Sequence, residues 1–111
     1  MKYACLVYMD ERAPATVSDR ECLAFGAQLR ERGQFVAGQA LQPTVTATVV
    51  RLRNGTPAVT DGPFAETKEQ LAGFYLIEAT DLNDAIRIAS SIPPARVGSI
   101  EVRPVRELDP T

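Results

Sequence analysis

The sequence predicts an α+β domain of the ferredoxin-like class, in which the element order βαββαβ is interrupted by one inserted β-hairpin. Three observations lead to this prediction. Short apolar runs alternate with two amphipathic stretches, which indicates two helices between strands. A helix-capping signature opens the first amphipathic stretch, and a β-branched run ends at a strong hairpin signal, Asn54-Gly55. We therefore expect an antiparallel sheet with both helices on one face.

The first half of the chain predicts a strand, a helix and a strand. Ser18 and Glu21 have the spacing of a capping box, and Val17 and Cys22 have the spacing of a hydrophobic staple across it. Gly33 follows a basic last turn, as a C-terminal helix glycine does. The expected elements are a strand at residues 2–9, a helix at residues 18–32 and a strand at residues 34–41.

The second half predicts the hairpin, a central strand, a helix and a last strand. Pro57 cannot donate to a β-ladder, which places the return strand of the hairpin at an edge. Asp81 or Thr80 caps the second helix, and Pro93-Pro94 ends it. The expected strands are residues 46–53, 56–60, 71–78 and 99–105. The expected buried stripe of the second helix is Leu82, Ala85, Ile86 and Ala89, with Ile88 as a further candidate.

Both faces of the expected sheet carry large apolar side chains. In the first strand Tyr3 and Leu6 point to opposite faces, and in the central strand Phe74 and Tyr75 do the same. The two helices can cover only one of these faces, and soluble monomers seldom leave so large an apolar patch exposed. We expect a homodimer that packs sheet against sheet.

Composition limits the class of protein. The 111 residues suit a single domain, residues 1–111, with 45% hydrophobic and 23% charged residues. A net charge of −2 without a basic run argues against nucleic acid as a partner. The chain has no histidine, and its two cysteines lack a CxxC spacing, so we expect neither a structural disulfide nor a metal site. We also expect no cofactor. The lack of a secretory signal or a long apolar run predicts a cytoplasmic protein without a membrane partner.

The stretch from Thr60 to Ile77 is the most distinctive in the chain. Its first part, Asp61-Gly62-Pro63-Phe64, predicts a loop of defined shape, because each of the first three residues restricts or permits particular backbone angles. Its second part is the central strand. With Glu101-Val102-Arg103-Pro104 near the end of the chain, this stretch resembles the YCII-related family, and in particular its DGPF subgroup.

The resemblance implies a dimeric α+β barrel with a cleft between the sheet and the partner chain. Some relatives are linked to dehalogenation or lactone chemistry, and other DGPF proteins are encoded beside sigma factors of the extracytoplasmic-function type. More distant relatives carry a histidine on the first helix as a proposed active-site residue. Cys22 stands at that position here, either as an apolar staple or as a reactive thiol.

Candidate site residues come from the loop and from the last strand. Asp61 is either a catalytic acid or base or a ligand anchor in the cleft, or it is the acceptor of an Asx turn or a loop cap. Phe64 is either the apolar anchor of the loop or a lid, and Lys68 is either solvated or an anion contact. Glu101 and Arg103 share one strand face, where they line a pocket or form an interface ion pair.

The tyrosines complete the candidate set. Tyr3 and Tyr75 lie on the expected central strands, as does Tyr8, and each is either a pocket wall or a core residue. We expect a cleft for a small anionic organic ligand, with cofactor-free acid–base chemistry, isomerisation or elimination, if the protein is an enzyme. The alternative is a non-catalytic regulatory or interaction module associated with a sigma-factor system.

Overall fold

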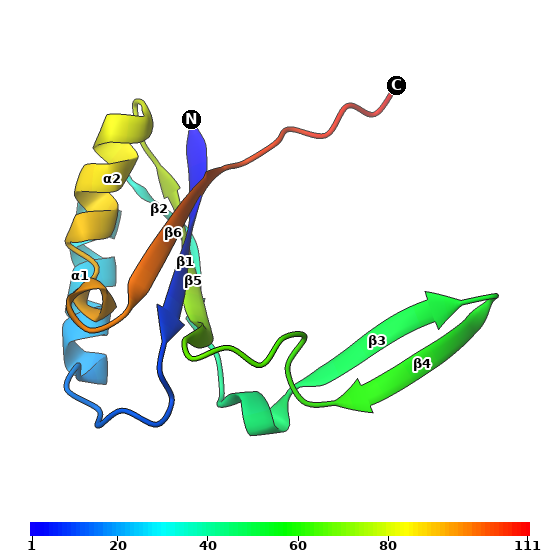
Figure 1. Cartoon of the computed structure of the whole chain (residues 1–111). Helices are drawn as coiled ribbons and strands as arrows, with labels where there is room; N and C mark the ends of the chain where they lie inside the picture. Colours follow the sequence, from blue (N-terminus) through cyan, green and yellow to red (C-terminus); the bar gives the residue numbers. More distant parts are fainter.

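The computed structural model describes residues 1–111 as a four-stranded sheet covered on one face by two α-helices, with a separate hairpin that extends away from them (Figure 1). The strands are β1 (Lys2–Met9), β2 (Phe35–Ala40), β3 (Thr48–Arg53), β4 (Thr56–Asp61), β5 (Gln70–Glu78) and β6 (Ser99–Pro104). The helices are α1 (Asp19–Glu31) and α2 (Leu82–Ser90), and two short 3-10 helices are η1 (Thr44–Thr46) and η2 (Pro93–Arg96).

The sheet has the strand order β2-β5-β1-β6, and all of its neighbouring strands are antiparallel. Strand β1 is central and pairs with β5 on one side and β6 on the other. This order is that of the split βαβ arrangement, in which each helix connects two strands that have another strand between them. The ferredoxin-like prediction with an inserted hairpin is therefore confirmed.

The caps and turns expected from the sequence are present. The Ser18 hydroxyl accepts a hydrogen bond from the Glu21 backbone N–H, and the Glu21 carboxylate accepts one from the Ser18 N–H. Asp81 caps α2 by accepting a hydrogen bond from the Asp84 N–H at 2.8 Å. Asn54 and Gly55 have positive φ angles of 51° and 75°, as a type I′ hairpin turn requires. Local sequence signals thus fix where both helices begin and where the hairpin turns.

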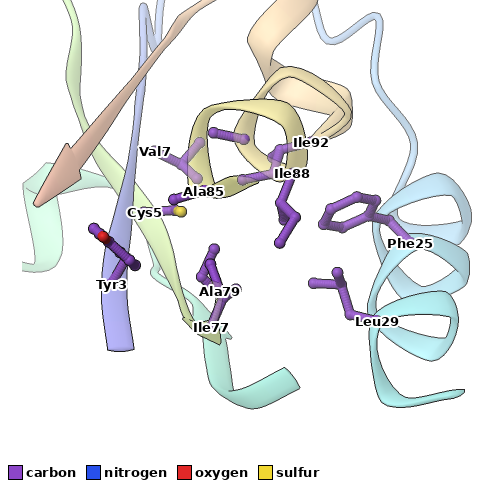
Figure 2. Packing of buried hydrophobic residues seen from close by; sticks show 11 residues of the cluster. Tyr3, Cys5, Val7, Phe25, Leu29, Ile77, Ala79, Ala85, Ile88 and Ile92 are labelled. Atoms are coloured by element: carbon purple, nitrogen blue, oxygen red, sulfur yellow. The ribbon is translucent and has the colours of Figure 1, made fainter. Parts of the chain in front are cut away.

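The hydrophobic core lies between the sheet and the helices. It is a cluster of eleven buried residues, with Cys5 and Val7 of β1 against α2, and Phe25 and Leu29 reaching in from α1 (Figure 2). Cys5 and Ala85 are both fully buried. Only one face of the sheet contributes to this cluster, so the packing of the single chain is one-sided.

Two details of the predicted elements are wrong. Leu82 and Ile86 are 49% and 47% exposed, because the inward stripe of α2 is rotated to Ala85, Ile88 and Ala89. The first hairpin strand begins at Thr48, not at residue 46, because residues 44–46 form η1. The Glu11 carboxylate holds the start of η1 by accepting hydrogen bonds from the Thr44 N–H at 2.8 Å and from its hydroxyl at 2.5 Å.

The other face of the sheet has no helix over it, and we call it the helix-free face. Pairing between β1 and β5 places Leu6 opposite Phe74 and Ala4 opposite Leu76 on this face, and all four side chains are half-buried. Pairing between β1 and β6 adds Glu101 and Arg103. The residues of the helix-free face include Ala4, Leu6, Tyr8, Ala37, Gln39, Leu71, Phe74, Leu76, Ser99, Glu101 and Arg103.

Neither helix is long and apolar enough to cross a membrane.

Replacing Leu29 by alanine should lower the free energy of unfolding by about 2–5 kcal/mol, because it removes a side chain that is 1% exposed and leaves a cavity. Urea denaturation at fixed protein concentration measures the loss. The matched control is Leu23→Ala in the same helix, where the leucine is 74% exposed and the change should stay within about 0.5 kcal/mol. Equal losses in both variants would contradict the buried face assigned to α1.

Stability should also decrease at alkaline pH because of Cys5. Burial raises the pKa of the Cys5 thiol from 9.0 to about 11, so the thiol ionises in the unfolded chain before it does so in the folded protein. The contribution of Cys5 is therefore complete below pH 9 and is lost as the pH rises toward 11. Urea titrations between these pH values should give a steeper loss in the wild type than in Cys5→Ala; identical slopes would refute the assignment.

Candidate functional site

The loop between β4 and β5 has a fixed shape. Gly62 has a φ of 105°, which favours glycine, and its N–H donates to the Ala47 carbonyl at 2.8 Å. The Gln70 amide then donates to the carbonyls of Ala65 and Thr67, both at 3.1 Å. These hydrogen bonds connect the two ends of the loop to neighbouring backbone, so the backbone that carries the side chains between them has a defined conformation.

A further hydrogen bond links this loop to the last strand. The Ser99 hydroxyl, at the start of β6, donates to the Glu69 carboxylate at 2.6 Å. Within the loop the Thr67 hydroxyl donates to the Glu69 carbonyl at 2.7 Å. The loop therefore ends beside the strand that carries the other charged candidates, Glu101 and Arg103.

Asp61 is the last residue of β4 and is exposed. Its carboxylate makes no hydrogen bond and no ion pair within the chain, so the Asx-turn alternative is wrong; the turn is held by the backbone of Gly62 instead. Asp61 lies opposite Thr48, and strand alternation places it on the same face of the hairpin as Val50 and Val59. An acidic side chain without a partner thus borders an exposed apolar surface.

Glu101 and Arg103 form an ion pair on the helix-free face. The Arg103 Nε donates to Glu101 Oε2 at 2.9 Å, and Arg103 Nη2 donates to the same oxygen. The side chains are 68% and 40% exposed for Arg103 and Glu101, and exposed pairs of this kind contribute only about 0–1 kcal/mol to stability. Because the fold gains little from the pair, its charges remain available to a ligand or a partner chain.

The two loop candidates, Phe64 and Lys68, are exposed. Phe64 is 80% exposed and its ring lies 5.8 Å from the guanidinium carbon of Arg51, so its prediction as the apolar anchor of the loop is wrong for the single chain. The Arg12 backbone N–H is the main cause of the lowered pKa of Asp10, and the positive charge of Lys68 is a smaller one. Lys68 therefore lies near the end of β1.

Tyr3 and Tyr75 belong to the helix-covered face of the sheet. Tyr3 is 2% exposed and its hydroxyl lies 3.8 Å from the Met1 sulfur. The Tyr75 ring packs edge-on against Phe25 with its centroid at 5.5 Å, and burial raises the pKa of its hydroxyl. The structure places both on the opposite side of the sheet from Arg103.

Tyr8 is the tyrosine that shares a face with the ion pair. It is half-buried on the helix-free face, opposite Ser99 of β6 and Leu71 of β5. Alternation along β1 already separates Tyr8 from Tyr3, and that signal in the sequence could have selected it for the site.

Cys22 has the properties of a packed thiol. It is half-buried, and burial is the main cause of its raised pKa, with the negative charges of Asp19 and Glu21 adding to the effect. A reactive cysteine needs the opposite setting, in which nearby positive charge stabilises the thiolate. The structure therefore favours the packed alternative at this position.

Two hollows on the surface are not lined by any predicted site residue. One, of about 270 Å³, is formed by α2, η2 and β6, and the other, of about 320 Å³, lies beside the start of β1. The first is lined by Ile86, Ala89, Ser90, Ala95, Ile100 and Val102, and the second by Met1, Gln34, Glu78, Ala79, Thr80 and Asp84. One chain thus divides the candidates among the helix-free face, the hairpin with its loop, and the core.

Comparisons with known proteins agree with the resemblance read from the sequence. A family model described as the YCII-related domain matches residues 1–109. A curated relative from Rhizobium meliloti (strain 1021), described as uncharacterized protein R00369, is 40% identical over 114 residues, which cover 95% of this chain and 92% of the relative. The chain therefore belongs to the YCII-related family.

Proposed function

We propose that the protein is a homodimer that binds a small anionic organic molecule against the helix-free face. The observation that carries the proposal is the position of the Glu101–Arg103 pair beside the apolar side chains of that face. The sequence around Asp61-Gly62-Pro63-Phe64 further supports membership of the DGPF subgroup of the family, which we include in the proposal.

Arg103 is the proposed contact for the anionic group. A guanidinium has five N–H donors in a planar fork that suits a carboxylate. Only Nε and Nη2 of Arg103 donate to Glu101, and they share one acceptor oxygen. Leu6 and Phe74 lie on the same face and offer an apolar surface for the hydrocarbon part of the ligand.

If the protein is an enzyme, the site supports cofactor-free acid–base chemistry. Asp61 is the proposed acid or base, because its carboxylate has no partner in the chain. It would take a proton from a carbon beside the anchored anionic group; returning the proton to another carbon completes an isomerisation. In an elimination the electron pair instead expels a leaving group. Tyr8 on the helix-free face could assist as a hydroxyl, and Lys68 could orient the anion.

A regulatory or interaction module is the second candidate. It is favoured by the dispersal of the candidates, since one chain does not bring Asp61 and Arg103 into a shared hollow. An interaction module of this kind recognises a partner protein and does not need an acid and a base around one reacting atom. The two candidates differ in whether a small molecule alone stabilises the protein.

A thermal-shift screen with small carboxylates, such as benzoate, maleate and malonate, tests the proposal. A carboxylate present at ten times its dissociation constant should stabilise the folded state by about 1.4 kcal/mol, which raises the melting temperature by roughly 5 °C. Arg103→Ala should abolish the shift, and Asp61→Asn should reduce or abolish it.

Two controls make the screen specific. Arg106→Ala removes another arginine from the exposed end of the chain, and Asp109→Asn removes another carboxylate from that end; both should keep the full shift. A shift that survives in Arg103→Ala would disprove the proposed anion contact. The absence of any shift across a broad carboxylate panel would favour the regulatory candidate.

A further inference from the structure

The single chain has far more surface than a compact protein of its mass. Its accessible area is 7989 Å², whereas a monomer of 12.1 kDa is expected to have about 6,000 Å². Its radius of gyration is 15.9 Å, against about 13 Å expected for 111 residues. The excess of about 2,000 Å² per chain lies within the range of roughly 1,000–2,500 Å² that one chain of an obligate homodimer buries.

The hairpin and the extended residues after β6 both contribute to this shape (Figure 1). We call β3 and β4 with their turn the arm, residues 48–61. The arm projects from the sheet on the side away from α1 and α2 (Figure 1). Val49 alone among the strand residues of the arm is half-buried, and the others are exposed. The arm therefore receives almost no cover from its own chain.

One face of the arm is apolar. Strand pairing places Val50 opposite Val59 and Leu52 opposite Pro57, and alternation puts both pairs on the same face. Val50, Leu52 and Val59 are 64–65% exposed. An isolated two-stranded hairpin is at best marginally stable in water, and it gains independent stability by packing an apolar face on another element. The structure of the arm thus requires a covering surface.

We propose that this surface is a second copy of the chain, so that the arm is a dimerisation arm whose apolar face packs on the partner. The arm and the bare sheet face lie on the same side of the chain (Figure 1), so a two-fold axis there would place each arm against the other chain. Arg51 and Arg53 alternate with Val50 and Leu52, so they lie on the other face of the arm and do not obstruct the packing of its apolar face.

This arrangement deepens the proposed function, and this part of the inference depends on it. Asp61 is on the same arm face as Val50 and Val59, so packing of that face carries its carboxylate to the partner chain. Arg103 remains on the helix-free face of its own sheet. A site that uses both residues would then be built from two chains, which explains why one chain does not gather them.

Sedimentation equilibrium of wild type and Leu52→Asn tests the arm without any ligand. The wild type should sediment as a dimer, and Leu52→Asn should raise the dimer dissociation constant by about 30-fold or more, since each dimer loses two apolar contacts. Leu108→Asn is the matched control, because Leu108 is also exposed, at 75%, but lies outside the arm; it should leave the constant unchanged. A monomeric wild type, or an unchanged constant in Leu52→Asn, would overturn the proposal.

Hydrogen exchange on the wild type gives a second readout that does not depend on how the variants fold. The amides of β3 and β4 should become more protected as concentration rises through the dimer transition, because the arm is ordered by its partner. Protection that does not change with concentration would overturn the proposal. Neither experiment uses a carboxylate, so a failure of the ligand screen and a failure of the arm are distinguishable.

Discussion

The structure depends on a core that occupies only one side of its sheet. Two helices pack on the face that carries Cys5, Val7 and Ile77, and the buried cluster forms there. The opposite face keeps Leu6, Phe74 and Leu76 half-buried. Burying apolar area is the main favourable term in folding, at about 25 cal/mol per Å². A second copy over the helix-free face would therefore add substantially to the stability of this small domain.

This one-sidedness also separates the residues that build the core from the charged candidate site residues. Side chains on the helix side, such as Tyr3 and Tyr75, are part of the packing of the domain. Charged side chains that the fold does not need, Glu101 and Arg103, lie on the other side. The loop of defined shape begins at the end of the arm and is fastened by Ser99 to the strand that carries them. The arrangement places the proposed chemistry away from the core, where a partner chain and a ligand have access.

Local and periodic signals made the fold predictable from the sequence. Three sequence patterns each predict a single local structure, and the structure contains all three. They are the capping box of Ser18 and Glu21, the Asn54-Gly55 turn and the alternation of side chains in β1. The rotation of α2 was less predictable, because apolar residues at Leu82 and Ile86 widen its stripe beyond the part that reaches the core. Local sequence patterns thus predict where helices and strands lie better than they predict which face of a helix is buried.

The candidate site was predictable only in part. Alternation correctly placed Glu101 and Arg103 on one face of the sheet. The role of Asp61 was not predictable, because Asp61 lies at the end of a hairpin that projects away from the four-stranded sheet. The sequence predicts Phe64 as the apolar anchor of the loop, but its side chain is 80% exposed in the single chain. Because Asp61 and Phe64 are both exposed in the single chain, no local sequence pattern indicates what surrounds them.

The most direct test of the account is hydroxyl-radical footprinting of Tyr8 and Phe74 on the wild type over a range of protein concentrations. Both side chains lie on the helix-free face, and Phe25 in the core serves as an internal reference. The account predicts that Tyr8 and Phe74 react slowly at high concentration and faster on dilution, while Phe25 stays unreactive. Rapid modification of Tyr8 and Phe74 at every concentration would show a face in contact with water and would contradict the account.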